Sequence, residues 1–184
     1  MTKKKALIYF VILVVSVSLT AVFKHFFLTD PAKDFPDVCK IAIGPNCTQY
    51  LSSLTQEKKY DEAVKIQLVR IHDNKSVLRT FKRKISNKDL LKMDNKKGIE
   101  ILLSCADTEI CKKDYYLLEA AIVTVKDIVN DLVFIADIQE NQYKDNVAAR
   151  KTLNDAIKVL KKNLYVAGSE DTIKALSEKV ESLK

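Results

Sequence analysis

The chain begins with an apolar run and then changes to a pattern of apolar and polar positions typical of helices. Residues 6–23 are eighteen consecutive uncharged residues, which is about the length needed to cross the hydrocarbon core of a bilayer. Backbone groups in lipid must be hydrogen-bonded within the segment, so this run predicts a transmembrane helix. Phe26, Phe27 and Leu28 continue it, and we expect residues 6–28 to contact the lipid bilayer.

A cleaved secretory signal is the alternative for this segment, because such a signal also begins with a basic stretch before an apolar run. The small residues that a cleavage site requires, around Ser16 and Ser18, lie inside the apolar run, so an uncleaved anchor is favoured. Three lysines in residues 1–5 predict that this stub is cytoplasmic, following the positive-inside rule. We therefore expect a single-pass protein of a bacterial inner membrane whose C-terminal domain lies in the periplasm.

The segment after the anchor has the composition of a linker. Residues 29–46 contain all three prolines of the chain and Gly44, a density that indicates irregular structure. From residue 47 onward the apolar positions recur at three- and four-residue steps, which is typical of amphipathic helices. These boundaries divide the chain into a cytoplasmic stub (1–5), an anchor (6–28), a linker (29–46) and an extracytoplasmic helical domain (47–184).

The first part of the domain predicts a helical hairpin. Tyr50, Leu51 and Leu54 form a short apolar stripe, and a second helix is expected over residues 60–72, ending at His72. Residues 58–64 (KKYDEAV) resemble the start of the second helix of a tetratricopeptide repeat, where an aromatic residue precedes a small residue by three positions. Nothing similar recurs about 34 residues later, so the resemblance implies one hairpin.

The remaining pattern predicts further helices. Ser86 and Asp89 have the spacing of a capping box at a helix start, and helices are also expected over residues 113–143, 147–164 and 169–183. In the longest of these, seven-residue spacing places on one seam Leu118, Ile122, Val125, Val129, Leu132 and Ala136. The predicted fold class is therefore all-α, either a helical bundle or a short superhelix like that of tetratricopeptide repeats.

Four cysteines, Cys39, Cys47, Cys105 and Cys111, all follow the predicted anchor. An even number of cysteines in an exported region predicts disulfides, which persist in oxidising compartments. Among the possible connectivities we favour Cys39–Cys47 and Cys105–Cys111, because each pair encloses a short polar or Gly-Pro loop. A structural zinc site would be expected to show Cys-x-x-Cys spacing, which neither pair has, so no metal or cofactor is expected.

The net charge of +7 is unevenly distributed along the chain. Residues 56–97 carry 13 basic and 6 acidic side chains, whereas residues 98–148 carry 4 basic and 10 acidic ones. The candidate binding surface is the basic run Arg79, Lys82, Arg83 and Lys84, since such clusters attract anions. An exported domain is not expected to meet nucleic acid, so an anionic lipid, an anionic envelope polymer or an acidic partner is favoured. A solvated helix face is the simpler interpretation.

The acidic residues of the long helix have a simple interpretation as well. Asp127 and Asp131 are one turn apart on its polar stripe, but no calcium-binding loop accompanies them. We expect them to be solvated, or to balance the charge of the basic segment that precedes them.

The sequence offers no catalytic grouping. It contains two histidines, His25 and His72, and no HExxH motif, P-loop or Ser-His-Asp arrangement. We therefore expect a non-enzymatic protein that acts by protein–protein interaction, as a scaffold, regulator or accessory subunit of an envelope complex. The alternatives are a secreted effector, toxin or immunity-type protein with a cleaved signal, and an enzyme that uses two carboxylates alone.

Overall fold

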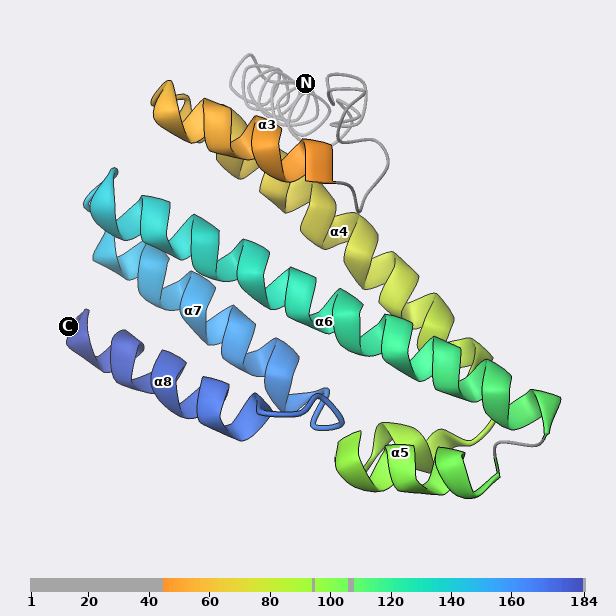
Figure 1. The fold of residues 1–184 in the computed structure, drawn as a ribbon. Coiled ribbons are helices and arrows are strands. Elements are labelled where there is room, and N and C mark those ends of the chain that lie inside the picture. The colour runs from red at the N-terminus through yellow and green to blue at the C-terminus, as the bar shows by residue number, and fades with distance from the viewer. Residues whose placement is uncertain (1–44, 94, 106–107, 184) are drawn as a thin grey trace, which may run out of the picture. The chain divides into compact units, whose positions relative to one another are not determined.

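A computed structural model of the chain describes residues 45–93, 95–105 and 108–183. Every element assigned within these residues is a helix, and the helices pack against one another, so the predicted all-α bundle is confirmed. Their order along the chain is α3 (Pro45–Gln56), α4 (Tyr60–Lys84), the 3₁₀ helix η1 (Lys88–Leu91), α5 (Asn95–Ser104), α6 (Glu109–Asn141), α7 (Asn146–Lys161) and α8 (Ser169–Ser182) (Figure 1).

The predicted membrane anchor, residues 6–28, lies outside the described residues, as do the stub before it and nearly all of the predicted linker, residues 29–46. The described residues all belong to one compact unit. Among the helices from α3 to α8, none is both long and apolar enough to cross a membrane.

Helix α6 is the central element of the bundle. It has 33 residues, which corresponds to about 50 Å at 1.5 Å per residue. It lies between α4 and α7, and α8 packs on the far side of α7 (Figure 1). The seam predicted from seven-residue spacing is buried, except that Ile122 is partly exposed. The helix begins at Glu109, four residues before the predicted start, because the Thr108 side chain accepts the Cys111 backbone N–H and caps it.

Helix α4 ends at Lys84, so the prediction that it ends at His72 is wrong. The four residues after His72, Asp-Asn-Lys-Ser, are common in turns. However, Asn74 is 1% exposed and lies on the buried face of the helix, between the buried residues Ile71 and Leu78. Packing along α6 therefore overrides the local preference for a turn.

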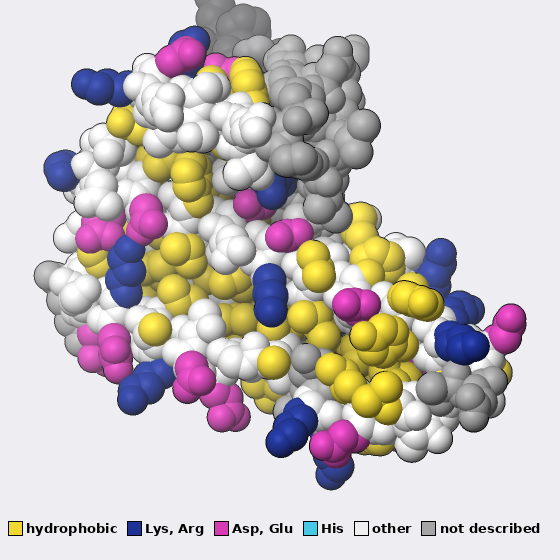
Figure 2. All heavy atoms as spheres, in the orientation of Figure 1, with side chains coloured by type: hydrophobic (Ala, Val, Ile, Leu, Met, Phe, Trp, Pro, Cys, Tyr) yellow, Lys and Arg dark blue, Asp and Glu magenta, His cyan; other side chains and the backbone are white. Residues whose placement is uncertain are grey.

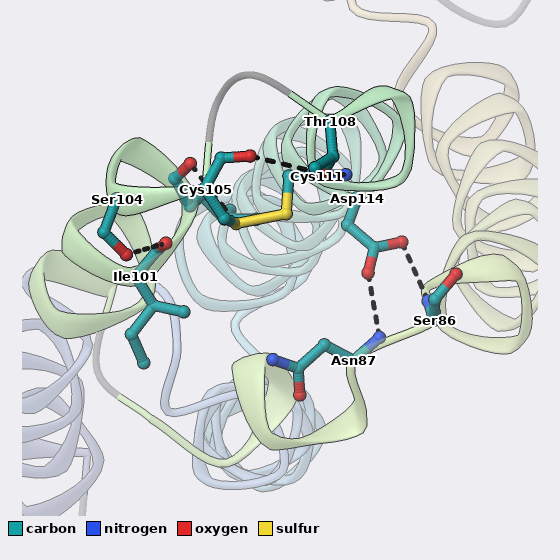
Figure 3. Close-up of a disulfide and its surroundings, with 9 residues drawn as sticks. Ser86, Asn87, Ile101, Ser104, Cys105, Thr108, Cys111 and Asp114 are labelled. Carbon is teal, nitrogen blue, oxygen red and sulfur yellow. Dashed lines mark hydrogen bonds between the residues drawn. A yellow bond between two sulfur atoms is a disulfide. The ribbon is translucent and has the colours of Figure 1, made fainter.

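The segment after α4 is held by a carboxylate of α6 and not by the predicted capping box. The two oxygens of Asp114 accept backbone hydrogen bonds at 2.8 Å, one from Ser86 and one from Asn87 (Figure 3). Asn87, and not Ser86, caps the single turn of η1 by accepting from the backbone of Asp89. The Lys88 ammonium donates to carbonyl oxygens at the end of α4. These bonds fix the C-terminal end of α4 beside the first turns of α6.

The predicted disulfide between Cys105 and Cys111 is confirmed. It joins the residue after α5 to the first turn of α6, with 6.0 Å between the two Cα atoms (Figure 3). Cys47, in α3, is buried and is not a free thiol. Its predicted partner, Cys39, lies outside the described residues.

Replacing both Cys105 and Cys111 with serine is expected to lower the free energy of unfolding by about 2 kcal/mol. The bond joins residues six apart, and closing so short a loop in the unfolded chain is worth roughly this much. Urea denaturation of the double variant and the parent chain, both without reductant so that Cys47 stays oxidised, measures the difference. An unchanged midpoint would show that this bond does not stabilise the fold.

Two lysines occupy backbone conformations that are usually given to glycine. Lys58 (φ 60°) lies in the turn between α3 and α4, and Lys144 (φ 55°) lies between α6 and α7. Gly168, immediately before α8, has a similar conformation (φ 74°). After each lysine, the next backbone N–H reaches back to a carbonyl near the end of the preceding helix, which closes that helix.

Candidate anion-binding groove

A groove of about 570 Å³ runs between α4 and α7, and cationic side chains line both of its walls. Helix α6, on which α4 and α7 both pack, contributes Ile128 to its lining. The basic side chains of the two walls are His72, Lys75, Arg79 and Lys82 from α4, and Lys158 and Lys162 from α7 and its C-terminal end.

Helical periodicity explains why these side chains share one groove. The four basic residues of α4 are three or four positions apart along the chain, so they lie on one face of the helix. Lys158 and Lys162 are likewise one turn apart. The apolar side chains of Leu78 and Val159 also line the groove, so its surface alternates between charged and apolar groups.

The groove has an excess of positive charge. Its lining contains one carboxylate, Asp155, which already pairs with Lys158 at 2.9 Å. Within the part of the chain that the structure describes, no carboxylate lies within ion-pair distance of Lys75, Arg79 or Lys162. An anion that enters the groove therefore meets cations whose charge is not yet balanced.

Lys82 is partly withdrawn from water. Its ammonium lies 5.3 Å from the ring centre of Tyr165, a buried residue that donates its hydroxyl to Asn163 at 3.0 Å. Partial burial lowers the pKa of Lys82, because a cation that loses hydration without gaining a carboxylate is destabilised. A bound anion would offset this loss and keep Lys82 protonated.

The structure places only part of the predicted basic patch in the groove. Arg79 and Lys82 line it, one turn apart on the inner face of α4. Arg83 and Lys84 are exposed and do not belong to the lining. The predicted patch therefore divides into two surfaces, and only the first of them faces α7.

Four residues of the groove were missed by reasoning from the sequence. His72, Lys75 and Arg79 have a helical spacing that is visible in the sequence. Because the helix was expected to end at His72, these three residues were not assigned to one helix face. Lys158 and Lys162 carry no such signal, because only the packing of α4 and α7 on α6 brings them near α4.

No protein family, curated protein or solved structure matches the chain. Over residues 45–183, apart from positions 94, 106 and 107, there is no group of three His, Cys, Asp or Glu side chains that could hold a metal ion.

A second cavity, of about 680 Å³, lies between α3, α4 and α6 and contains buried charge. Asp131 is 4% exposed and lies 3.5 Å from the guanidinium of Arg70 on α4. With its amide nitrogen turned toward α6, Gln67 also donates to Asp131 at 2.7 Å. The expectation that Asp131 is solvated is wrong. The alternative expectation, that the acidic helix balances the basic segment, is confirmed at this pair.

Burial determines the charge state of this second cavity. It raises the pKa of Asp131 to about 7, against the opposing effect of Arg70. Asp127, one turn earlier and half-buried, also has a raised pKa because of burial. The one guanidinium in the lining of this cavity is already paired with a carboxyl group, that of Asp131, so the cavity has no excess of positive charge. For this reason we take the α4–α7 groove as the candidate site.

Proposed function

We propose that this protein is a non-enzymatic, membrane-anchored binding protein that holds an acidic segment of a partner protein in the α4–α7 groove. Residues 6–28 anchor it in a bacterial inner membrane, and the periplasmic helical domain serves as a scaffold, regulator or accessory subunit of an envelope complex. The observation that carries the proposal is the unbalanced charge of the groove. Five lysine or arginine side chains surround one carboxylate, which is already paired.

The lining of the groove favours a protein segment over a simple polyanion. From His72 to Lys82 the α4 wall extends about 15 Å at 1.5 Å per residue, which is the length of two to three turns of a bound helix. The apolar side chains of Leu78, Ile128 and Val159 lie among the cations. A uniformly charged polymer has nothing to place against them, whereas an amphipathic helix with acidic residues beside its apolar stripe does.

Reversing two cations of the groove is expected to remove most partner binding. In Arg79→Glu/Lys162→Glu one cation of each wall becomes an anion, so the groove repels the acidic segment that it attracted. Crosslinking in native membranes followed by co-purification measures the recovered partner, which should fall at least about tenfold, equivalent to about 1.4 kcal/mol. The matched control is Lys144→Glu/Lys174→Glu, which changes the net charge equally at exposed positions outside the groove.

The control should recover as much partner as the parent chain. If both double variants lose the partner to the same extent, overall charge and not the groove governs binding, and the site is wrong. If neither variant loses it, the partner does not use these cations. Circular dichroism of the purified variants checks that both retain the helical fold.

A further inference from the structure

Apolar side chains are exposed at the corner where α5 meets α6. Leu103 is 66% exposed and Tyr116 is 68% exposed. With Tyr115 they line a shallow depression of about 160 Å³ that also includes Cys111 of the disulfide. Figure 2 shows hydrophobic side chains gathered between α5 and the N-terminal half of α6. Exposed apolar surface of this kind indicates a place of contact with another body.

Cations lie beside this corner. Lys112 lines the same depression, and the exposed Lys113 follows it in the first turns of α6. Arg83 and Lys84 are near, because Asp114 of α6 binds the backbone immediately after α4. Among the described residues, none of these four cations has a carboxylate within ion-pair distance. The corner therefore combines apolar side chains with positive charge that is not balanced by ion pairs.

This combination fits an anionic lipid surface better than a protein partner. The depression is far smaller than the roughly 300–1,000 Å³ of small-molecule pockets, so a small ligand does not fit it, and Leu103 and Tyr116 are exposed beyond it. Lysine is depleted at protein interfaces, where arginine is enriched. Leucine and tyrosine with adjacent lysines are typical of segments that lie in the headgroup layer, where the apolar groups are buried and the ammonium groups reach lipid phosphates.

We propose that the α5–α6 corner docks onto an anionic bilayer, with Leu103 and Tyr116 in the headgroup layer and Lys112 and Lys113 against lipid phosphates. The Cys105–Cys111 bond holds the end of α5 against the start of α6, so little conformational freedom is lost on docking. The ten residues 29–38 separate the predicted anchor from Cys39, the predicted partner of Cys47, and can span up to about 35 Å when extended. This docking rests on one part of the proposed function, the membrane anchor formed by residues 6–28, and does not require the groove to bind a partner.

A tryptophan reporter tests the docking, because the chain contains no tryptophan. Full-length Tyr116→Trp is reconstituted into vesicles of brominated phosphatidylcholine, alone or with about 30% phosphatidylglycerol to supply negative surface charge. We expect tryptophan fluorescence to be quenched at least about twofold more in the anionic vesicles, and the excess to disappear in about 1 M salt, where the Debye length is only about 3 Å. Val147→Trp, at an exposed position at the start of α7, is the matched control and should stay unquenched.

A second reporter, Leu103→Trp, keeps the test valid if Tyr116→Trp disturbs the fold, and it should behave in the same way. Quenching at both positions that is no greater than at Val147→Trp overturns the proposal and leaves the corner as a surface for a protein. Equal quenching with and without phosphatidylglycerol also overturns it, because the docking would then not depend on charge.

Charge variants separate this docking from partner binding. Adding Lys112→Glu/Lys113→Glu to the reporter chain should remove the excess quenching in anionic vesicles, and retention of that excess contradicts the proposed role of these lysines. Adding Arg79→Glu/Lys162→Glu should leave the quenching unchanged. The proposal for the groove and the proposal for the corner can thus be refuted independently of each other.

Discussion

Replacing Asp114 with alanine is expected to lower the free energy of unfolding by about 3 kcal/mol. Asp114 is 2% exposed, and its oxygens accept the backbone N–H groups of Ser86 and Asn87 (Figure 3). Alanine removes both acceptors, and a hydrogen bond to a charged group contributes about 1.5–3 kcal/mol. Because these bonds join α6 to the turn after α4, their loss also weakens the contact between two long helices. Urea denaturation of the variant and the parent measures the change.

Asp89→Ala is the matched control for this effect. Asp89 lies in the same turn but is exposed, and its carboxylate pairs with Lys92 at 2.9 Å. Exposed ion pairs typically contribute less than about 1 kcal/mol, so this variant should unfold close to the parent. If Asp114→Ala is destabilised no more than Asp89→Ala, the α6 carboxylate does not hold the turn.

Asp131→Asn is expected to abolish a loss of stability that the parent chain shows as the pH rises from about 4 to 7. Burial raises the pKa of Asp131 from 3.8 to about 7, so in this range the folded state holds a proton that the unfolded state has released. The contribution of Asp131 to the free energy of unfolding is therefore greatest below the pKa of this group in the unfolded state, and it falls as the pH approaches 7. At 1.36 kcal/mol per pKa unit, the upper limit of this fall is about 4 kcal/mol. Because asparagine does not titrate, the Asp131→Asn variant should not show this fall.

Chemical denaturation of parent and variant at several pH values across this range measures the fall. Asp127→Asn is the control, because Asp127 is only half-buried on the same side of α6 and its replacement should leave most of the fall in place. A parent chain whose stability rises over this range contradicts the expectation. The same fall in Asp131→Asn as in the parent would assign it to another group.

Helix α6 could be predicted from the sequence because its apolar seam repeats without interruption and is then buried against α4 and α7. The end of α4 could not be predicted, since Asn74 and its neighbours have turn preferences and only burial shows that the helix continues. The capping box at Ser86 failed for a related reason. Its backbone N–H is taken by Asp114, which lies 28 residues later in the chain, and no local pattern reveals such a contact.

Only one of the two walls of the candidate groove could be predicted from the sequence. Its α4 wall follows from the helical spacing of Lys75, Arg79 and Lys82 once the helix is known to continue. Its α7 wall depends on tertiary packing that brings distant segments together. Asp131 was misjudged in the same way, because it falls on the polar stripe of α6 and is buried only where α3 and α4 also line the cavity.

The two lysines with left-handed backbone, Lys58 and Lys144, mean that this protein is less stable than its fold permits. A residue with a Cβ is disfavoured in that conformation by about 1 kcal/mol relative to glycine, and the chain accepts this at the turns after α3 and α6. Natural selection commonly retains proteins that are stable enough for function without driving them to the optimum. Glycine at either of these two turns would therefore strengthen the fold without altering its core.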